Sequence, residues 1–273
     1  SWKSDEEFVK NEVNDPNGRF TVGTPRTSDG SLLFLQHLIH KMETSGSRIG
    51  IVFNGSPLFT GDAGSGESEI RKLIIENDWL ECIVSLPDRM FFNTGITTYV
   101  WIVTNKKSSD RKGKVQLIDG TSFSTSMRKN LGAKGKIITE EQIQQLFEIY
   151  ENNEGNEFCK IYPNSFFGYT KVVVEQPLIE DGDVKTDKQG NKKPDTSKRD
   201  SERVPLSESI DEYYNREVKP HVPDSWMDRS KDKIGYEINF TKYFYKFTLR
   251  RGLEDISQDL KSLDDEIKQL SLV

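Results

Sequence analysis

Helical and strand-like apolar patterns alternate between residues 31 and 103, and this alternation constrains the fold more than any other feature of the sequence. Leu and Ile recur at helical spacing in two segments, and short β-rich runs separate them: helices 31–42 and 67–77, strands 48–53, 81–86 and 99–103. Such alternation predicts an α/β fold with parallel strand pairing. The link 87–98 is too short for a crossover helix, so strands 81–86 and 99–103 are expected to pair antiparallel.

The charge balance limits what this chain can bind by itself. Its 273 residues carry a net charge of −6, and 30% of them are charged. A protein that binds nucleic acid unaided usually has a basic excess or a basic face. Any contact with DNA must therefore be local or depend on partners.

The cysteines and histidines favour a cytoplasmic protein with neither a disulfide framework nor a metal site. Cys82 and Cys159 lie far apart, and Cys82 falls in an apolar run where a buried thiol is expected. His37, His40 and His221 show no metal-ligand spacing with them. The sequence has no signal peptide and no apolar run long enough to cross a bilayer, so a reducing cytoplasm is the expected location.

The rest of the chain is less regular. Residues 1–30 are polar, rich in Gly, Pro, Asn and Asp, and predict an extended loop; the start at Ser1 without an initiator Met suggests a fragment boundary. Thr139 and Gln142 form the capping box of a further helix. The other expected elements are strands 115–118, 166–178 and 236–249, a helix at 210–218 and a flexible polar segment at 181–203.

The C-terminal residues predict a helix with a coiled-coil seam. Its apolar residues alternate by three and four positions: Leu253, Ile256, Leu260, Leu263, Ile267 and Leu270. An amphipathic helix of this length is marginal alone, so it docks either onto its own chain or into a bundle with another subunit. The helix is acidic, which argues against DNA as its partner.

A glycine-rich loop at 54–66 has the glycine spacing of a phosphate-binding loop. Glu67 stands where such a loop needs a lysine, and a carboxylate there would repel a triphosphate. The third glycine of a dinucleotide fingerprint is also absent. We therefore reject nucleotide phosphate binding and expect a flexible loop at the carboxyl end of a strand, where contact with a substrate stays open.

The loop between the strands at 81–86 and 99–103 contains two adjacent aromatics and a polar turn: Phe91, Phe92, Asn93, Thr94 and Gly95. Alternation would point one ring into the core and the other into a cleft, where it could stack on a flat ligand such as a flipped base. The alternative is that both rings fill the core, and composition alone favours that alternative.

A second run interleaves basic and aromatic residues between Lys242 and Arg251: Lys242, Tyr243, Phe244, Tyr245, Lys246, Phe247, Arg250 and Arg251. Such a run is typical of a stacking platform for nucleic acid. An amphipathic strand whose lysines reach out to solvent is the more frequent explanation.

Several runs together resemble the modification (M) subunits of type I restriction–modification systems. They are Leu33–Leu38, Arg48–Val52, Gly66–Lys72, Leu86-Pro87, Phe91–Ile96, Lys114–Asp119, Asp211–Tyr213, Glu217-Val218, Pro220–Trp226 and Lys233–Ile238. The resemblance covers nearly the whole chain except 181–203. It implies adenine-N6 DNA methylation with S-adenosylmethionine as cofactor.

In that family a Gly-rich loop binds the cofactor and an Asn-Pro-Pro-Phe/Tyr motif holds the flipped adenine. The pairs at Asp15-Pro16-Asn17 and Tyr162-Pro163-Asn164 do not fit that motif. The resemblance therefore implies that the main cofactor loop and the catalytic residues are not in this chain, that they lie upstream of Ser1, and that the chain is inactive alone.

The resemblance also assigns roles to residues that are present. Phe91 aligns with the aromatic that packs on the flipped base, Phe92 is the alternative, and Asn93, Thr94 and Gly95 shape the loop. The seam from Leu253 to Leu270 resembles the segment that bundles with the specificity subunit. The expected partners are the specificity subunit, the restriction subunit and, in the assembled complex, DNA; no membrane partner is expected.

The expected fold class is the C-terminal half of a Rossmann-like methyltransferase sheet (1–154, with 1–30 as a target-loop region). An α+β extension (155–252) and a subunit-docking, coiled-coil-type helix (253–273) follow. Two other hypotheses stay open. One is a non-catalytic assembly module that docks the specificity subunit, and the other is a different Rossmann-type enzyme that uses the 54–66 loop.

Overall fold

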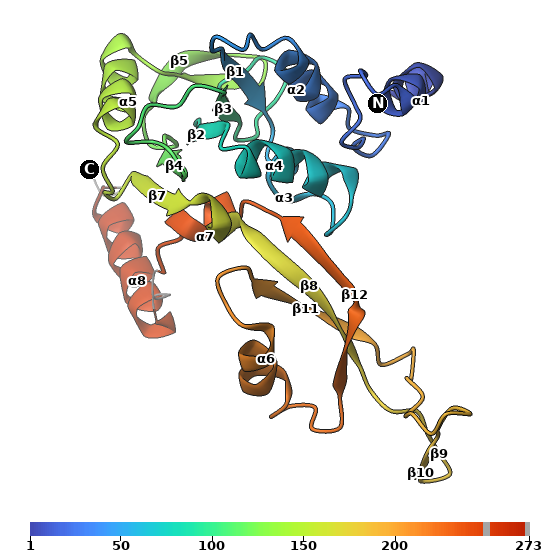
Figure 1. Cartoon of the computed structure of the whole chain (residues 1–273). Helices are drawn as coiled ribbons and strands as arrows, with labels where there is room; N and C mark the ends of the chain where they lie inside the picture. The colour runs from blue at the N-terminus through green and yellow to red at the C-terminus, as the bar shows by residue number, and fades with distance from the viewer. Residues whose placement is uncertain (248–251, 271–273) are drawn as a thin grey trace. The chain divides into compact units, whose positions relative to one another are not determined.

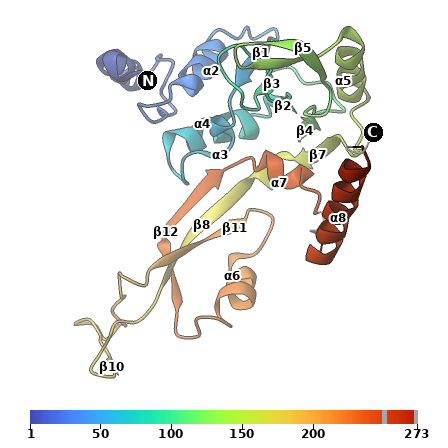
Figure 2. The ribbon, with the colours of Figure 1, turned by 180° about the vertical axis from the view of Figure 1, so that it is seen from behind.

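The structure, a computed structural model, describes residues 1–247 and 252–270 (Figures 1 and 2). These residues fall into two compact units, Ser1–Tyr243 and the segment from Phe244 onward. Residues on both sides of the expected 154/155 boundary belong to the first unit. The division at 154/155 into a catalytic half and an α+β extension stays a prediction.

The core of the first unit is a five-stranded mixed sheet in a mixed α/β fold. Its strand order is β1 (Arg48–Phe53), β3 (Tyr99–Thr104), β2 (Leu80–Ser85), β4 (Lys114–Asp119) and β7 (Cys159–Pro163). β3 runs antiparallel to both β1 and β2, β2 and β4 are parallel, and β7 is antiparallel to β4.

The predicted antiparallel pairing of 81–86 with 99–103 is confirmed. The expected parallel pairing of the first two strands is wrong in detail. β1 and β2 run in the same direction, but β3 lies between them and pairs with both. The short 86–98 link allows this arrangement, because it turns the chain straight back beside β2. As a consequence β1 lies at an edge, and Val52 is half exposed where a buried strand was expected.

Helices form where the spacing of Leu and Ile predicted them: α2 (Ser31–His40), α4 (Gly66–Glu76) and α5 (Glu140–Asn152), with a short α3 (Ser56–Phe59) between β1 and α4. The capping box of α5 is confirmed, because Thr139 accepts a hydrogen bond from the Gln142 N–H and Gln142 accepts one from the Thr139 N–H. Leu146 and Tyr150 of α5 pack on a cluster that contains Cys82, Ile118 and Cys159. Both cysteines are buried free thiols.

The expectation of an extended loop for residues 1–30 is wrong over its first half. A 3-10 turn, η1 (Lys3–Asp5), leads into α1 (Glu6–Asn14). Val9 of α1 packs against Phe20 and Leu33, and Val13 of the same helix packs on this cluster, so apolar contacts hold α1 to the rest of the unit. Residues 15–30 contain turns without a helix or strand.

A separate three-stranded antiparallel sheet follows β7 in the chain. Its order is β11 (Asp200–Pro205), β8 (Gly168–Glu175), β12 (Trp226–Tyr236), preceded by the 3-10 turn η2 (Asn164–Phe167). Figures 1 and 2 both show β8 and β12 side by side, with a small hairpin of β9 (Ile179–Glu180) and β10 (Asp183–Val184) beyond their ends.

Two expectations for this part need correction. Residues 200–203 belong to β11 and pair with β8, so the polar stretch 181–203 is not a linker throughout. No strand forms in the described residues 237–247 of the stretch 236–249, where one was expected. Tyr236 is the last residue of β12, α7 (Phe240–Phe244) follows it, and Leu249 lies outside the described residues. The expected helix at 210–218 is confirmed as α6 (Ile210–Tyr213) continued by the π-helical turn η3 (Tyr214–Val218).

The basic and aromatic run that begins at Lys242 does not start as the expected amphipathic strand, because its first three residues belong to the helix α7. Tyr243 packs against the rings of Tyr162, Phe166 and Phe167, which places it in an aromatic cluster. Tyr245 and Phe247 are exposed, and Arg250 and Arg251 lie outside the described residues.

The second unit contains the predicted C-terminal helix, α8 (Leu253–Leu270). Within residues 1–247 and 252–270, no helix combines the length and the apolar character needed to span a bilayer.

Candidate functional site

The loop 86–98 leaves the carboxyl end of β2 and returns into β3. A hydrogen bond from the Leu86 N–H to the Thr98 carbonyl (2.8 Å) joins the two ends of the loop. A second one, from the Arg89 N–H to the Gly95 carbonyl (3.3 Å), joins its two sides nearer the tip. Arg89 has a φ of 58°, the left-handed conformation that lets the chain turn here. The loop is therefore a folded turn at the edge of the sheet where α/β folds place their ligands.

The structure exposes both aromatic rings of this loop. Phe91 is 38% exposed and Phe92 is 58% exposed, so neither side chain fills the core. The expectation that alternation would bury one of the two rings is wrong. Phe91 forms an isolated bridge with Thr94, so the backbone here is a tight turn and does not continue the alternation of β2.

The polar residues that follow the rings form the turn itself. Asn93 and Gly95 are exposed, and the Thr94 hydroxyl accepts a hydrogen bond from the Ile96 N–H (3.4 Å). The structure thus brings Phe91, Phe92 and the Asn-Thr-Gly turn together at one loop, as the sequence predicted for their location.

A hairpin that sequence reasoning missed packs against this loop. It consists of β5 (Thr125–Leu131) and β6 (Lys134–Ile137). The Ala133 N–H donates to the Phe92 carbonyl (2.9 Å), and the N–H groups of Gly135 and Lys136 donate to the Arg89 carbonyl (2.9 and 3.2 Å). The signal that could have found the hairpin is Gly132, whose φ of +62° makes the turn between two extended runs.

An ion pair adds to these backbone bonds. The Lys136 ammonium pairs with the Asp88 carboxylate, and its hydrogen bond lowers the pKa of Asp88 below the ordinary value. The Lys134 ammonium lies over the ring of Phe92, 5.3 Å from its centroid. Phe92 thus has a cation over its ring, although its side chain is more exposed than that of Phe91.

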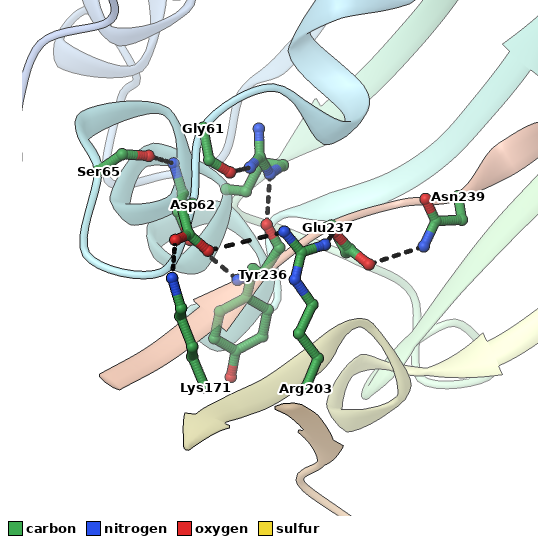
Figure 3. Close-up of polar contacts among 10 residues, drawn as sticks. Gly61, Asp62, Ser65, Lys171, Arg203, Tyr236, Glu237 and Asn239 are labelled. Carbon is green, nitrogen blue, oxygen red and sulfur yellow. Dashed lines mark hydrogen bonds and ion pairs between the residues drawn. The ribbon is translucent and has the colours of Figure 1, made fainter. Parts of the chain in front are cut away.

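The glycine-rich loop is a junction between α4 and the three-stranded sheet (Figure 3). Asp62 pairs with Lys171 of β8 and, at 3.6 Å, with Arg203 of β11. Partial burial raises the pKa of Asp62, but the Lys171 hydrogen bond and charge, the Ala63 N–H and the charge of Arg203 together outweigh it, so the pKa is lowered. Ser65 caps α4 by accepting a hydrogen bond from the Ser68 N–H (3.3 Å).

Arg71 of α4 lies beneath this loop and is fully buried. Its guanidinium donates to the carbonyls of Tyr236 (2.6 Å), Pro57 (2.9 Å) and Gly61 (3.4 Å). Burial lowers the pKa of Arg71 to about 10, which leaves the side chain charged at neutral pH. Three backbone carbonyls therefore accept hydrogen bonds from the buried guanidinium, one of them from this loop.

Two further expectations concerned metal binding and the C-terminal seam. The sequence predicted no metal site. In the described ranges, 1–247 and 252–270, no group of three or more His, Cys, Asp or Glu side chains is placed to hold a metal ion. The seam side chains are all exposed: Leu253, Ile256, Leu260, Leu263, Ile267 and Leu270.

Comparison with known proteins relates these features to one family. The N-6 DNA methylase family matches residues 2–189. The type I restriction enzyme MjaIX methylase subunit of Methanocaldococcus jannaschii is 27% identical over 191 residues, which cover 67% of this chain and 32% of that protein. The type I restriction enzyme HindI methylase subunit of Haemophilus influenzae is 36% identical over 107 residues, which cover 39% of this chain and 23% of that protein.

A solved methyltransferase subunit of a type I restriction-modification system, from Streptococcus thermophilus, aligns with a TM-score of 0.49. It shares 24% identity, and the alignment covers 57% of this chain and 31% of that chain. The present chain thus spans about a third or less of the length of these relatives. Because the family match extends over more than half of the sequence, the chain belongs to the N-6 DNA methylase family.

Proposed function

We propose that this chain is the C-terminal part of a type I restriction–modification M subunit, which transfers a methyl group from S-adenosylmethionine to adenine N6 in DNA. Within that subunit the 86–98 loop supplies the far half of the adenine site. The observation that carries the proposal is the exposed Phe91, on a folded loop at the carboxyl edge of the sheet, in a member of the N-6 DNA methylase family.

The physical reason lies in the reaction. The N6 atom of adenine cannot be reached inside a duplex, so the base must leave the stack and lose its stacking energy. An aromatic ring on the protein replaces part of that energy, at about 1–3 kcal/mol per stacked base. Phe91 suits this role because its loop is held by hydrogen bonds and its ring is not part of the core.

Phe92 is the alternative ring, and its surroundings favour a supporting role. The Lys134 ammonium lies over the Phe92 ring, and the Phe92 carbonyl accepts the Ala133 N–H. A base that stacked on the same face of Phe92 would have to displace Lys134. We therefore assign the stacking role to Phe91, and the shaping of the turn to Asn93, Thr94 and Gly95.

The described residues do not fit the cofactor at the glycine-rich loop. Asp62 is ion-paired, the Gly61 carbonyl accepts from Arg71, and Ser65 caps α4. No Asn-Pro-Pro-aromatic motif occurs in the sequence. We propose that the cofactor loop and the catalytic motif belong to another part of the subunit and that this chain is inactive in isolation.

The edge of the main sheet supports the proposal that the sheet is half of a larger Rossmann-like sheet. β1 is an edge strand, and a largely apolar hollow lies beside it. Three apolar residues line that hollow: Phe8, Phe34 and Val52. At least half of each of these residues is exposed. A soluble domain seldom leaves such a patch uncovered, so further strands and helices of the subunit would fit there.

A second function is favoured by α8. Its six seam residues are exposed. The helix also contains six acidic residues: Glu254, Asp255, Asp259, Asp264, Asp265 and Glu266. An apolar seam on an acidic helix suits a helical protein partner better than DNA. We propose that α8 docks the specificity subunit, which would read the DNA sequence, and that the restriction subunit joins the same cytoplasmic complex.

Methylation by the full-length subunit in its complex tests the stacking role. Phe91→Ala should lower the methylation rate at least tenfold and leave the affinity for S-adenosylmethionine unchanged, because the ring holds the base and not the cofactor. Phe147→Ala removes a similarly exposed ring from α5 and should change neither quantity. An unchanged methylation rate in the Phe91 variant would refute the stacking role.

Calorimetric titration of the 273-residue chain with S-adenosylmethionine tests the assignment of the cofactor site. We expect no binding heat. Clear binding that is lost in an Asp62→Ala variant would place a cofactor site at the glycine-rich loop and would contradict the proposal.

A further inference from the structure

The β5–β6 hairpin is strongly basic in a chain that is acidic overall. Between Asp119 and Glu140 the sequence has no acidic residue and four basic ones: Arg128, Lys129, Lys134 and Lys136. The chain as a whole carries a charge of −6. This local excess of positive charge is what a nucleic-acid contact requires when the net charge does not supply it.

The hairpin is hydrogen-bonded to the loop that carries the two aromatic rings. Its backbone donates three hydrogen bonds to carbonyls of the 86–98 loop, one of them to Phe92 and two to Arg89. Gly132 approaches so closely that a Cβ there would lie 2.7 Å from the Phe92 carbonyl oxygen. The distance between the hairpin and Phe91 is therefore set by the fold.

Most of this charge is not neutralised by the protein. Lys136 pairs with Asp88, but no carboxylate in the part of the chain that the structure describes comes within 4.0 Å of the basic groups of Arg128, Lys129 or Lys134. Arg128 and Lys129 are exposed on β5. Both side chains are long enough to reach a ligand that lies across the hairpin.

We propose that the β5–β6 hairpin grips the phosphodiester backbone of DNA beside the target base, with Arg128 and Lys129 on phosphates. This inference rests on the proposed function and identifies the surface that would hold the strand. A base swings out by rotation about its own backbone, so the flanking phosphates must be held while it moves. Phosphate contacts provide that register without reading the sequence.

The neighbouring residues favour DNA over an acidic protein segment as the occupant. Phe91 and Phe92 are exposed at the side of the hairpin, and Lys134 lies over the Phe92 ring. Cations beside exposed aromatic rings match a polymer that alternates phosphates with flat bases. An acidic helix would match the charge but would leave the two rings exposed.

The salt dependence of DNA binding by the assembled complex tests this inference. Each lost phosphate contact should reduce the slope of log K against log salt by about 0.9, so Arg128→Gln with Lys129→Gln should reduce it by about 2 between about 50 and 200 mM salt. Affinity at the low-salt end should fall about tenfold or more. Arg128→Lys with Lys129→Arg keeps the charges and should restore the slope.

The matched control removes two exposed lysines elsewhere. Lys188→Gln with Lys192→Gln changes the net charge equally, at the β9–β10 end of the second sheet, and should leave the slope unchanged. An unchanged slope in the Arg128 and Lys129 variant would overturn the inference. If that variant also loses binding of a partner subunit, the occupant of the hairpin is an acidic protein and not DNA.

Failure of the proposed function gives a different pattern. If Phe91→Ala keeps full methylation while the hairpin variant loses slope, the stacking role is refuted and the hairpin inference stands. If the wild-type complex binds no DNA at low salt, both are overturned.

Discussion

The guanidinium Nε of Arg71 donates a 2.6 Å hydrogen bond to the backbone carbonyl of Tyr236, a residue 165 positions later in the chain. The Tyr236 N–H in turn donates to the Ser68 hydroxyl (3.0 Å), and the Tyr236 hydroxyl donates to Glu76 (2.9 Å). One face of α4 therefore satisfies both backbone groups and the side chain of the last residue of β12. These contacts join the second sheet to the α/β part of the first unit.

Arg71→Met should destabilise the protein strongly, because the methionine keeps the apolar stem but removes the donors of three hydrogen bonds to carbonyls, two of them buried. We expect a loss of about 3–5 kcal/mol in the free energy of unfolding, measured by urea denaturation. Arg216→Met removes an exposed arginine that pairs with Glu208 and Glu217, and should cost less than about 1 kcal/mol. Equal losses in the two variants would show that the Arg71 contacts do not hold the junction.

Gly132→Ala should loosen the hairpin from the 86–98 loop. The new Cβ meets the Phe92 carbonyl at 2.7 Å, and a φ of +62° is unfavourable for alanine by about 1–2 kcal/mol. Hydrogen exchange at the Ala133 and Gly135 amides should therefore become about tenfold faster. Gly190→Ala has the same kind of backbone strain (φ +87°) but an open surrounding, so faster exchange at Ala133 in that variant as well would contradict the steric explanation.

Leu260→Glu with Leu263→Glu should abolish copurification with the specificity subunit, because two carboxylates on the seam cannot be buried against a partner helix. Gln258→Glu with Ser262→Glu adds the same charge to α8 away from the seam and should preserve assembly. Assembly that survives in the seam variant would mean that α8 docks on its own chain.

The Glu12 carboxylate should titrate at unusually low pH. Arg19 donates to it from its backbone N–H (2.9 Å), Nε (3.0 Å) and Nη2 (2.8 Å), and these bonds lower the pKa of Glu12 to about 2. Because the folded-state pKa is depressed, the stabilising effect is present above the unfolded pKa of about 4.3 and is lost as the pH falls toward about 2.

NMR titration of the Glu12 side-chain carbon measures this pKa directly. Arg19→Gln should return it toward the ordinary value, whereas Lys10→Gln should not change it, because Lys10 pairs with Glu6. A Glu12 pKa near 4 in the unaltered chain would show that the contact with Arg19 does not persist in solution.

Local sequence determined the elements whose sequence signal is local. The apolar runs at 48–53 and 81–86 have few alternatives to a strand, and the Thr139–Gln142 capping box marks a helix start through neighbouring atoms alone. The local sequence also predicted the location of Phe91 and Phe92 between two strands and the heptad spacing from Leu253 to Leu270. The role of Phe91 came from a family resemblance, because an aromatic pair alone is more often core.

Tertiary structure decided the features that depend on distant residues. β11 is polar and exposed on most positions, and it is a strand because β8 offers a pairing edge. Arg71 and Ser68 bind the backbone of Tyr236, the last residue of its strand. The apolar periodicity of residues 236–249 contains no sign of these contacts with α4. The basic hairpin lies beside both rings because of hydrogen bonds across about 40 residues of chain, and hydrophobic pattern carries no information about partners so far apart.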